Sequence, residues 1–332
     1  MRRKKEFNRH TQHPAYLESY RSGNLEKVAG KAYAMLASCT LCPRRCKVNR
    51  LNNETGYCRI GLRARIFNFI AHHGEEPPVS GTRGSGTIFF SGCNMACAYC
   101  QNYEFSQSAR GGETEAERIA QCMIELQDQG CHNINFVTPT HVMPQILKAL
   151  LIAITKGLKI PLVYNTGGYE LPQIIKLLDG IVDIYLVDMR YYDNAMSRTY
   201  SDAPKYPRYN QSTIIQMHKQ VGVAKFDKAG IIRSGLIVRH LVLPEDICGT
   251  EGIMRFISEQ VSKKTYISLM SQYLPCYKAK AIKELSRRIT PSEYGRAQGI
   301  MERIGLGNGW TQEAYGLESL AGIHIKPILY DT

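Results

Sequence analysis

Three cysteines lie within eight residues of the sequence, in the stretch CNMACAYC, as Cys93, Cys97 and Cys100. Single buried cysteines are common in protein cores, but three in one glycine-containing loop indicate metal ligation. A zinc ion would need a fourth ligand, which His72, His73 or another cysteine would supply. The spacing favours a [4Fe–4S] cluster on three thiolates, whose fourth iron has no protein ligand. An open coordination position of this kind is where a metal centre does chemistry.

A second set of cysteines precedes the first. Its spacing is C-x2-C-x3-C-x11-C, and its members are Cys39, Cys42, Cys46 and Cys58. Four thiols make a complete ligand set for zinc or for a second iron–sulfur cluster, and the spacing suits both. Because no coordination position is left open, we expect a structural or electron-relay role rather than direct catalysis. The remaining cysteines show no spacing signal: Cys122, Cys131, Cys248 and Cys276. Cys276 follows the last predicted strand, where it could approach the mouth of a site.

Short apolar segments rich in β-branched and aromatic residues must position these cysteines. We predict six strands, separated by helical segments, at 87–92, 132–139, 161–168, 182–190, 235–244 and 265–270. Strands joined in this way run parallel and are buried on both faces. Six strands are too few for a closed eight-stranded barrel but suit an open, partial one. The predicted fold is therefore α/β, a partial (β/α)6 barrel with a small N-terminal Cys-rich metal-binding extension.

We expect three parts along the chain. Residues 1–84 form the helical and Cys-rich extension, with two short helices in 14–37 and a strand in 63–74; residues 85–275 form the barrel; residues 276–332 form a C-terminal helical segment packed on it. Ligands of parallel sheets bind at the carboxyl ends of the strands. The polar residues predicted at those ends are Ser91, Thr138, Asn165, Asp188, His240 and Gln272.

The residue before the third cysteine of the first set is aromatic, Tyr99. With this feature, the cysteine spacing resembles the signature of the radical S-adenosylmethionine (SAM) superfamily. The stretches HHGEEPPVSGTRGSGTIFFSGCNMACAYCQNYEFSQ, HNINFVTPTHVMPQIL, PLVYNTGGYE, DIYLVDMRYYD and LIVRHLVLPED resemble the pyruvate formate-lyase-activating-enzyme-like group of that superfamily. The similarity extends across nearly the whole chain.

This resemblance implies a reaction. The amino and carboxylate groups of SAM would chelate the open iron, and the reduced cluster would cleave SAM to a 5′-deoxyadenosyl radical that abstracts hydrogen from a substrate. The implied substrate is a protein, as for enzymes that activate glycyl radical enzymes; the alternative is radical SAM modification of a small molecule, a peptide or RNA. The implied electron donor is a protein such as flavodoxin or ferredoxin.

The resemblance also implies contacts to SAM. The backbone around Tyr99 would pair with the adenine edge, with Asn102 beside it, and Gln272 is a further adenine or ribose candidate. After the second strand, many relatives carry Gly-Gly-Glu-Pro, which meets the SAM amino group. This sequence has VTPT there, so Thr138 and Thr140 can accept hydrogen bonds but the carboxylate is absent.

Further contacts are implied after the next three strands. Asn165, in the segment NTGG, resembles the loop that reaches the SAM ribose or a nearby cation. Asp188 and Arg190 stand where activating enzymes carry Asp-x-Lys, and arginine can hold a carboxylate with two parallel hydrogen bonds. Arg239 is a suitable partner for the SAM carboxylate. His240 either faces the site or is an internally bonded strand-end histidine.

The segment HHGEEP at 72–77 offers two histidines and two glutamates for acid–base or metal chemistry. Two adjacent residues point opposite ways in extended chain, so at most one of each pair faces a given site. We therefore expect at most one residue of the pair His72 and His73, and one of the pair Glu75 and Glu76, to have a role in the site.

The chain carries 42 Lys and Arg against 29 Asp and Glu, a net charge of +13. Because these residues are scattered, with one dense run at 2–5, we read a basic soluble enzyme rather than a nucleic-acid binder, and no RNA-binding module is recognisable. We find no apolar run of membrane-spanning length and no signal peptide, so we expect a cytoplasmic protein. Eleven cysteines in that compartment favour metal ligation over disulfides.

Overall fold

The computed structural model describes residues 13–108 and 110–312 of the chain. Its strands follow the order β10-β9-β8-β6-β5-β4-β2-β1-β3, and the short β7 (Lys225–Phe226) pairs with β8 outside this path. Six successive neighbours in this order are parallel: β2 (Ser85–Phe90), β4 (Ile134–Val137), β5 (Leu162–Thr166), β6 (Ile184–Asp188), β8 (Ile232–Leu241) and β9 (Tyr266–Met270). They correspond to the six strands that the sequence predicts, so the α/β class with a mostly parallel sheet is confirmed.

Further strands extend the sheet at its two edges. The predicted strand in 63–74 is β1 (Ala64–His72), which pairs antiparallel with β2, and β3 (Gly112–Thr114) pairs antiparallel with β1. At the other edge, β10 (Gly309–Thr311) pairs parallel with β9. Because β3 and β10 are not neighbours in the strand order, the sheet of the described residues is open rather than a closed barrel.

The sheet is apolar on both faces, because alternate residues of a strand point to opposite sides. One set packs in the same core as the helices; on three strands it comprises Tyr164, Tyr185, Val187, Leu236 and Val238. The residues between them form a separate core on the other face: Val163, Ile184, Leu186 and Ile237. Burial on both faces explains why these strands read as continuous apolar runs in the sequence.

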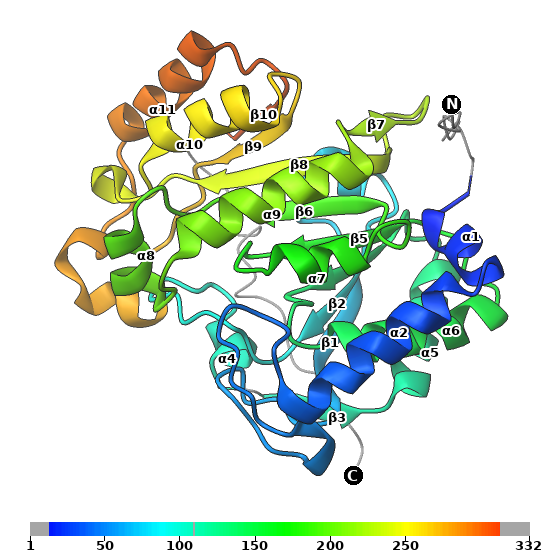
Figure 1. The fold of residues 1–332 in the computed structure, drawn as a ribbon. Coiled ribbons are helices and arrows are strands. Elements are labelled where there is room, and N and C mark those ends of the chain that lie inside the picture. Colours follow the sequence, from blue (N-terminus) through cyan, green and yellow to red (C-terminus); the bar gives the residue numbers. More distant parts are fainter. Residues whose placement is uncertain (1–12, 109, 313–332) are drawn as a thin grey trace, which may run out of the picture.

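The helices surround the sheet, and α2, α5 and α6 lie side by side (Figure 1). The helices are α1 (Ala15–Arg21), α2 (Asn24–Ala34), α3 (Pro77–Ser80), α4 (Tyr103–Ser106), α5 (Ala116–Asp128), α6 (Met143–Thr155), α7 (Pro172–Leu177), α8 (Asn194–Ser201), α9 (Tyr206–Val221), α10 (Thr250–Phe256) and α11 (Pro291–Ile304). Single 3₁₀ turns lie at Met35–Ser38, Arg50–Asn52, Pro244–Asp246, Tyr277–Ala281 and Lys283–Leu285, and a π-helical turn at Ile257–Val261. Helix α5 buries Ile119, Met123 and Leu126 on one side.

The N-terminal helices are tied to the ends of the strands that lie away from the cysteines. The backbone N–H of Ala15 donates to Asp183 Oδ1 at 2.7 Å, and the Tyr16 hydroxyl donates to the Ile160 carbonyl at 3.0 Å. The division of the chain at residues 84 and 275 stays a prediction. The sheet takes β1 from before the first boundary and β10 from after the second.

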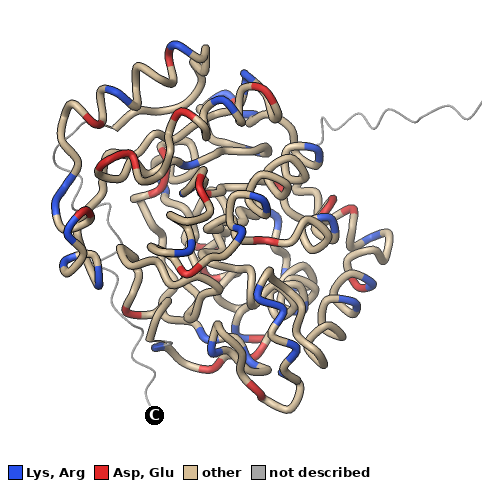
Figure 2. The backbone as a smooth tube through the Cα atoms, turned by 60° about the vertical axis from the view of Figure 1, so that its left-hand side comes forward, with Lys and Arg blue, Asp and Glu red and all other residues tan. Residues whose placement is uncertain are grey.

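Charged residues of both signs are distributed over helices and loops alike (Figure 2). The basic run at 2–5 and residues 313–332 of the predicted C-terminal segment lie outside the described residues. No helix in the described part of the chain combines the length and the apolar character needed to cross a membrane.

Candidate radical SAM site and a second cysteine cluster

The loop after β2 carries the first cysteine set. Gly92, with φ at +80°, turns the chain out of the strand in a conformation that favours glycine. The loop is held by two backbone bonds, from Ala96 N–H to Ser201 O at 2.9 Å and from Ala98 N–H to Tyr200 O at 2.8 Å. The three thiols line one cleft at the carboxyl ends of the parallel strands: Cys93, Cys97 and Cys100.

The thiols of Cys93 and Cys100 are poor acids on their own. Burial, with a smaller contribution from Cys97, raises the pKa of Cys100 to about 12, and the same two causes raise the pKa of Cys93. The Met95 N–H lies 3.4 Å from Cys93 Sγ, and Ser106 Oγ lies 3.1 Å from Cys100 Sγ. Because a thiolate is the ligand form, binding a metal cation would supply the charge that ionises them.

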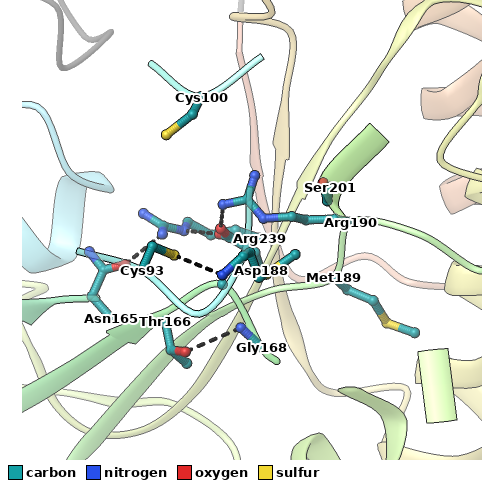
Figure 3. Close-up of polar contacts among 12 residues, drawn as sticks. Cys93, Cys100, Asn165, Thr166, Gly168, Asp188, Met189, Arg190, Ser201 and Arg239 are labelled. Atoms are coloured by element: carbon teal, nitrogen blue, oxygen red, sulfur yellow. Dashed lines mark hydrogen bonds and ion pairs between the residues drawn. The ribbon is translucent and has the colours of Figure 1, made fainter. Parts of the chain in front are cut away.

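A charged network lines the same cleft as the thiols (Figure 3). Arg239 donates from Nε to Asp188 Oδ1 at 2.8 Å, from Nη1 to Glu75 Oε2 at 3.2 Å and from Nη2 to Asn165 Oδ1 at 2.5 Å. These residues come from β8, β6, β5 and the loop after β1. They meet because the parallel strands end at one edge of the sheet.

Arg190 joins this network and faces the cysteine loop. Its Nη2 donates to Asp188 Oδ2, and its side chain is close enough to Cys97 and Tyr99 to interact with them electrostatically. The backbone N–H of Arg190 is bonded to the Tyr206 hydroxyl at 3.1 Å. Within the described structure the buried Nε of Arg190 has no hydrogen-bond partner. A bound ligand would supply the acceptor that this donor lacks.

Glu75 is the member of its pair that lines the cleft. Its Oε1 accepts from Asn135 at 2.9 Å and from Asn165 at 3.1 Å. Burial raises the pKa of Glu75, and Arg239 opposes that shift. His72 also lines the cleft. Asn135 was not foreseen; the only signal was one polar residue inside the buried strand β4.

Most of the predicted SAM-contact residues line this cleft: Tyr99, Asn102, Thr138, Asn165, Asp188, Arg190, Arg239 and Gln272. Two do not. Thr140 donates its hydroxyl to the buried Glu170. His240 bonds through its ring nitrogens to Met189 O at 2.9 Å and Thr250 Oγ1 at 3.1 Å. Since Arg239 faces the cleft, its neighbour on β8 must point to the other side of the sheet.

Two residues near the mouth have unexpected placements. Thr138 has φ at +59°, which is rare for a β-branched residue and marks a strained turn at the end of β4. Cys276 is buried beneath the cysteine loop, with Sγ 3.4 Å from Tyr99 O, and does not line the cleft. Sequence reasoning also missed several cleft-lining residues, among them Asn94, Met95, Gln101, Gln107 and Leu241. Leu241 follows Arg239 by two residues, so strand alternation could have identified it.

The second cysteine set lines a smaller cavity of its own: Cys39, Cys42, Cys46 and Cys58, with Arg44, Arg50, Tyr57, Asn94 and His141 among the other lining residues. Two backbone bonds close the turn around Cys39, which donates to Val48 O at 3.0 Å and accepts from Lys47 at 2.9 Å. A Cβ at Gly56 would lie 2.8 Å from Cys46 Sγ, so the loop needs glycine there. Burial raises the pKa of Cys42 to about 12.

A buried arginine lies beneath this second set. Arg50 is 1% exposed. Its Nε donates to Gly61 O at 2.9 Å, and its Nη1 donates to His141 O at 2.7 Å and lies 4.0 Å from Cys39 Sγ. Among residues 13–108 and 110–312, Nη2 has no partner and no carboxylate pairs with the guanidinium. Burial lowers the pKa of His141 to about 4, so the neighbouring imidazole is neutral.

Neither cysteine set is a preformed site for a single metal ion. Across the described residues, no three His, Cys, Asp or Glu side chains are grouped closely enough to hold one. Instead, the thiols of each set line a cavity of their own, and an arginine lies beside each group of thiols. Soft thiolate donors suit iron–sulfur clusters and zinc.

Residues 87–257, about half of the chain, match the family model of the Radical SAM superfamily. The chain belongs to this superfamily. It is also 32% identical over 279 residues, which are 81% of this chain and 75% of the other, to the uncharacterized protein MJ0674 of Methanocaldococcus jannaschii.

Solved structures show a looser likeness. The structure of SuiB from Streptococcus suis bound to SAM gives a TM-score of 0.46 at 12% identity, covering 67% of this chain and 50% of that one. HydG, a maturase of the [FeFe]-hydrogenase, gives 0.47 at 12% identity, covering 89% and 65%. The chain thus spans about half the length of SuiB.

Membership makes this protein a radical SAM enzyme and implies a [4Fe–4S] cluster and SAM. The residues present fit that pair. Three thiols share one cleft, which suits a cluster with one iron free of protein ligands. The unpartnered Nε of Arg190 is a donor that the carboxylate of a bound amino acid would satisfy.

Proposed function

We propose that Cys93, Cys97 and Cys100 hold the [4Fe–4S] cluster and that SAM binds beside it in the cleft. The observation that supports this most directly is that the three thiols and the Arg190–Asp188–Arg239 network line the same cavity. When bound and reduced, cluster and SAM together supply a 5′-deoxyadenosyl radical that abstracts hydrogen from a substrate.

The chain's own residues bind and orient in this proposal. Arg190 donates from its free Nε to the SAM carboxylate, while Asp188 holds the guanidinium in place through Nη2. Thr138 and Asn102 present polar groups to the rest of SAM, and the backbone of Tyr99 pairs with the adenine. Asp188 and Tyr99 are buried, and Arg190, Thr138 and Asn102 are half-buried, so the site limits the access of water to reactive species.

The proposed substrate is a protein, as in enzymes that activate glycyl radical enzymes. Five separate stretches of the chain resemble that group, and the cleft at the carboxyl ends of an open sheet would offer room for a polypeptide loop. A second candidate is modification of a small molecule, a peptide or RNA. This second candidate is favoured by the segment VTPT, with its strained Thr138, because many relatives carry Gly-Gly-Glu-Pro there.

Hydrogen transfer tests the proposal. The full chain, reconstituted with iron and sulfide without oxygen and reduced, should cleave SAM to methionine and 5′-deoxyadenosine. Cys97→Ala should not, whereas Cys122→Ala, a matched change of a buried cysteine in α5, should retain cleavage. Deuterium from a glycine of a partner protein should appear in deoxyadenosine. Deuterium transfer from a small molecule or nucleotide instead would overturn the protein substrate.

We also propose that Cys39, Cys42, Cys46 and Cys58 hold a second metal centre, zinc or iron–sulfur. The support is Arg50, since a buried guanidinium without a carboxylate is costly unless the thiols beside it carry negative charge. Elemental analysis should find more metal per chain than one cluster accounts for, and Cys39→Ser should lose that excess. Equal metal in both proteins would contradict the second centre.

A further inference from the structure

The two cysteine loops touch at the residue before Cys93. A Cβ on Gly92 would lie 2.4 Å from the carbonyl oxygen of Cys58, and the φ of Gly92 is +80°. No other residue type fits at this position without moving one loop. Gly92 is the residue before Cys93. The backbone of Cys58, in the second set, is therefore separated from the backbone next to Cys93, in the first set, by one van der Waals contact.

Side chains hold the same two loops together. Arg44, which lies between Cys42 and Cys46, donates from Nε to the Asn94 carbonyl at 2.9 Å and packs over the Tyr57 ring at 3.5 Å. Asn94 lines both cavities, so it forms the wall between them.

A third link runs beneath the wall. His141 Nε2 is bonded to Ser91 O at 2.7 Å, and Arg50 bonds to the backbone of His141. Three independent contacts therefore fix the distance between the two cysteine sets.

The second set also reaches the surface. Cys46 is exposed, whereas Cys39 is buried and lies on the side of Arg50. Arg45 and Lys47, the neighbours of Cys46, are exposed as well. Between Cys39 and Cys58 the chain has one carboxylate, Glu54, and it accepts a hydrogen bond from Asn49 within the loop. From outside the loop, the exposed Asp202 is paired with Arg44 at 3.5 Å and accepts from the Tyr57 hydroxyl at 2.7 Å. The charge next to Cys46 itself is therefore that of Arg45 and Lys47, which is positive.

We propose that the second set holds an iron–sulfur cluster and is the entry point for the electron that reduces the first, with an acidic one-electron carrier protein docking around Cys46. This rests on the proposed metal centres. One electron leaves the reduced carrier, which is oxidised, enters the chain at Cys46 and passes across the Cys58–Gly92 contact to the cluster on Cys93, which is reduced. Zinc has no redox chemistry, so the proposal requires iron. Opposite charges steer such encounters, which makes them sensitive to salt.

Metal content is the first test. The full chain reconstituted without oxygen should hold about eight irons, two [4Fe–4S] clusters, and no zinc. Cys97→Ala should hold about four, with a cluster signal in electron paramagnetic resonance after reduction that comes from the second set. About four irons and one zinc would overturn the relay while leaving the second metal centre intact. Four irons and no other metal would overturn both.

The second test measures how fast the first cluster is reduced, followed by its absorbance. The double variant Arg45→Glu/Lys47→Glu should bind the same metal but accept electrons from reduced flavodoxin at least about tenfold more slowly, relative to dithionite, than the unchanged chain. Lys225→Glu/Lys228→Glu, the same reversal at exposed lysines on and after β7, is the control and should keep the original ratio. An unchanged ratio in the first variant, or an equal loss in the control, would overturn docking at Cys46.

A third measurement tests the charge on Arg50 without using activity. Replacing a cation beside a cluster by Arg50→Met should lower the midpoint potential of the second cluster, and a tenfold change in the one-electron equilibrium corresponds to 59 mV. The potential of the first cluster should stay the same. A shift of the first cluster alone would contradict the assignment of Arg50 to the second set.

Discussion

The two cysteine regions balance buried positive charge in different ways. At the first, Arg239 is paired with Asp188 and Glu75, and Arg190 is paired with Asp188. At the second, Arg50 is bonded to backbone carbonyls, and within the described structure no carboxylate faces it. The first region is therefore close to neutral by itself, whereas at the second the charge of Arg50 would be balanced by negative charge on the neighbouring thiols.

In the proposed function, this difference would separate a site that exchanges its ligand from one that keeps its ligand. A cleft whose arginines already have carboxylate partners can lose a ligand at each turnover without leaving a buried charge unpaired. The second cavity would have no such freedom. Loss of its metal would reprotonate the thiols and leave the buried charge of Arg50 unpaired. In the proposed function, metal at the second set would therefore be part of the folded structure, whereas SAM at the first set would be bound and released.

The largest expected effect comes from removing one ligand of the first set. Cys97→Ala should reduce SAM cleavage by more than about 10³-fold, because the group that assembles the reaction is lost. The metal of the second set should remain, since each set lines its own cavity. Activity and metal content would be measured on the same preparation. Loss of all metal would show that the two sets do not load independently.

Arg50→Met is expected to have the next largest effect. In the metal-loaded protein it should lower the free energy of unfolding by about 3 kcal/mol, because a buried anionic centre loses its counter-charge. In the metal-free protein the loss should be smaller, since there the guanidinium is itself the unpaired charge. Denaturant unfolding with and without metal measures both values. Arg50→Lys is the matched control, which keeps the charge but not the fixed fork of donors. Equal losses in both forms would remove the contrast between the regions.

The sequence predicts the parallel core well because burial on both faces determines the residue types of a strand as well as its place in the sheet. Strands buried on two faces must be continuously apolar, and each of the six runs is a strand. The short strands β3, β7 and β10 were not predicted. They have two or three residues each, so their sequences carry no periodicity, and their pairing depends on neighbours distant in the chain.

Strand ends also predict much of the candidate site, and the failures have local causes. Asn165, Asp188 and Arg239 line the cleft as the rule for parallel sheets requires. Thr140 follows the left-handed turn at Thr138, which redirects its side chain toward Glu170. The contact between the two cysteine loops could not be predicted, because it depends on tertiary approach and not on spacing.

A moderate effect is expected for Arg190, the arginine of the first region with a free donor. Arg190→Ala should weaken SAM binding by about 10- to 100-fold, the value of a lost charge-assisted hydrogen bond of about 1.5–3 kcal/mol. Arg190→Lys should recover part of the affinity, because a point charge replaces the planar fork. Equilibrium dialysis of SAM against the loaded, unreduced protein measures this. Arg208→Ala, an exposed arginine on α9, is the control; a comparable loss there would mean that overall charge, not position, determines affinity.

The smallest effect is expected at Asp183, which lies at the opposite ends of the strands from both cysteine sets and anchors α1. Burial raises its pKa to about 7, although two backbone N–H groups oppose the shift. Because the folded pKa lies above the unfolded value of about 3.9, the folded state binds the extra proton, and stability falls as pH rises toward 7, by at most about 1.4 kcal/mol per unit. Asp183→Asn should flatten that slope between pH 5 and 7 in denaturant unfolding. Some slope should remain, since burial raises the pKa of Glu170 to about 7 as well. The metal content of both sets should not change. A change in either would mean that the two cysteine regions are coupled through the far end of the barrel, which the contacts of Asp183 give no reason to expect.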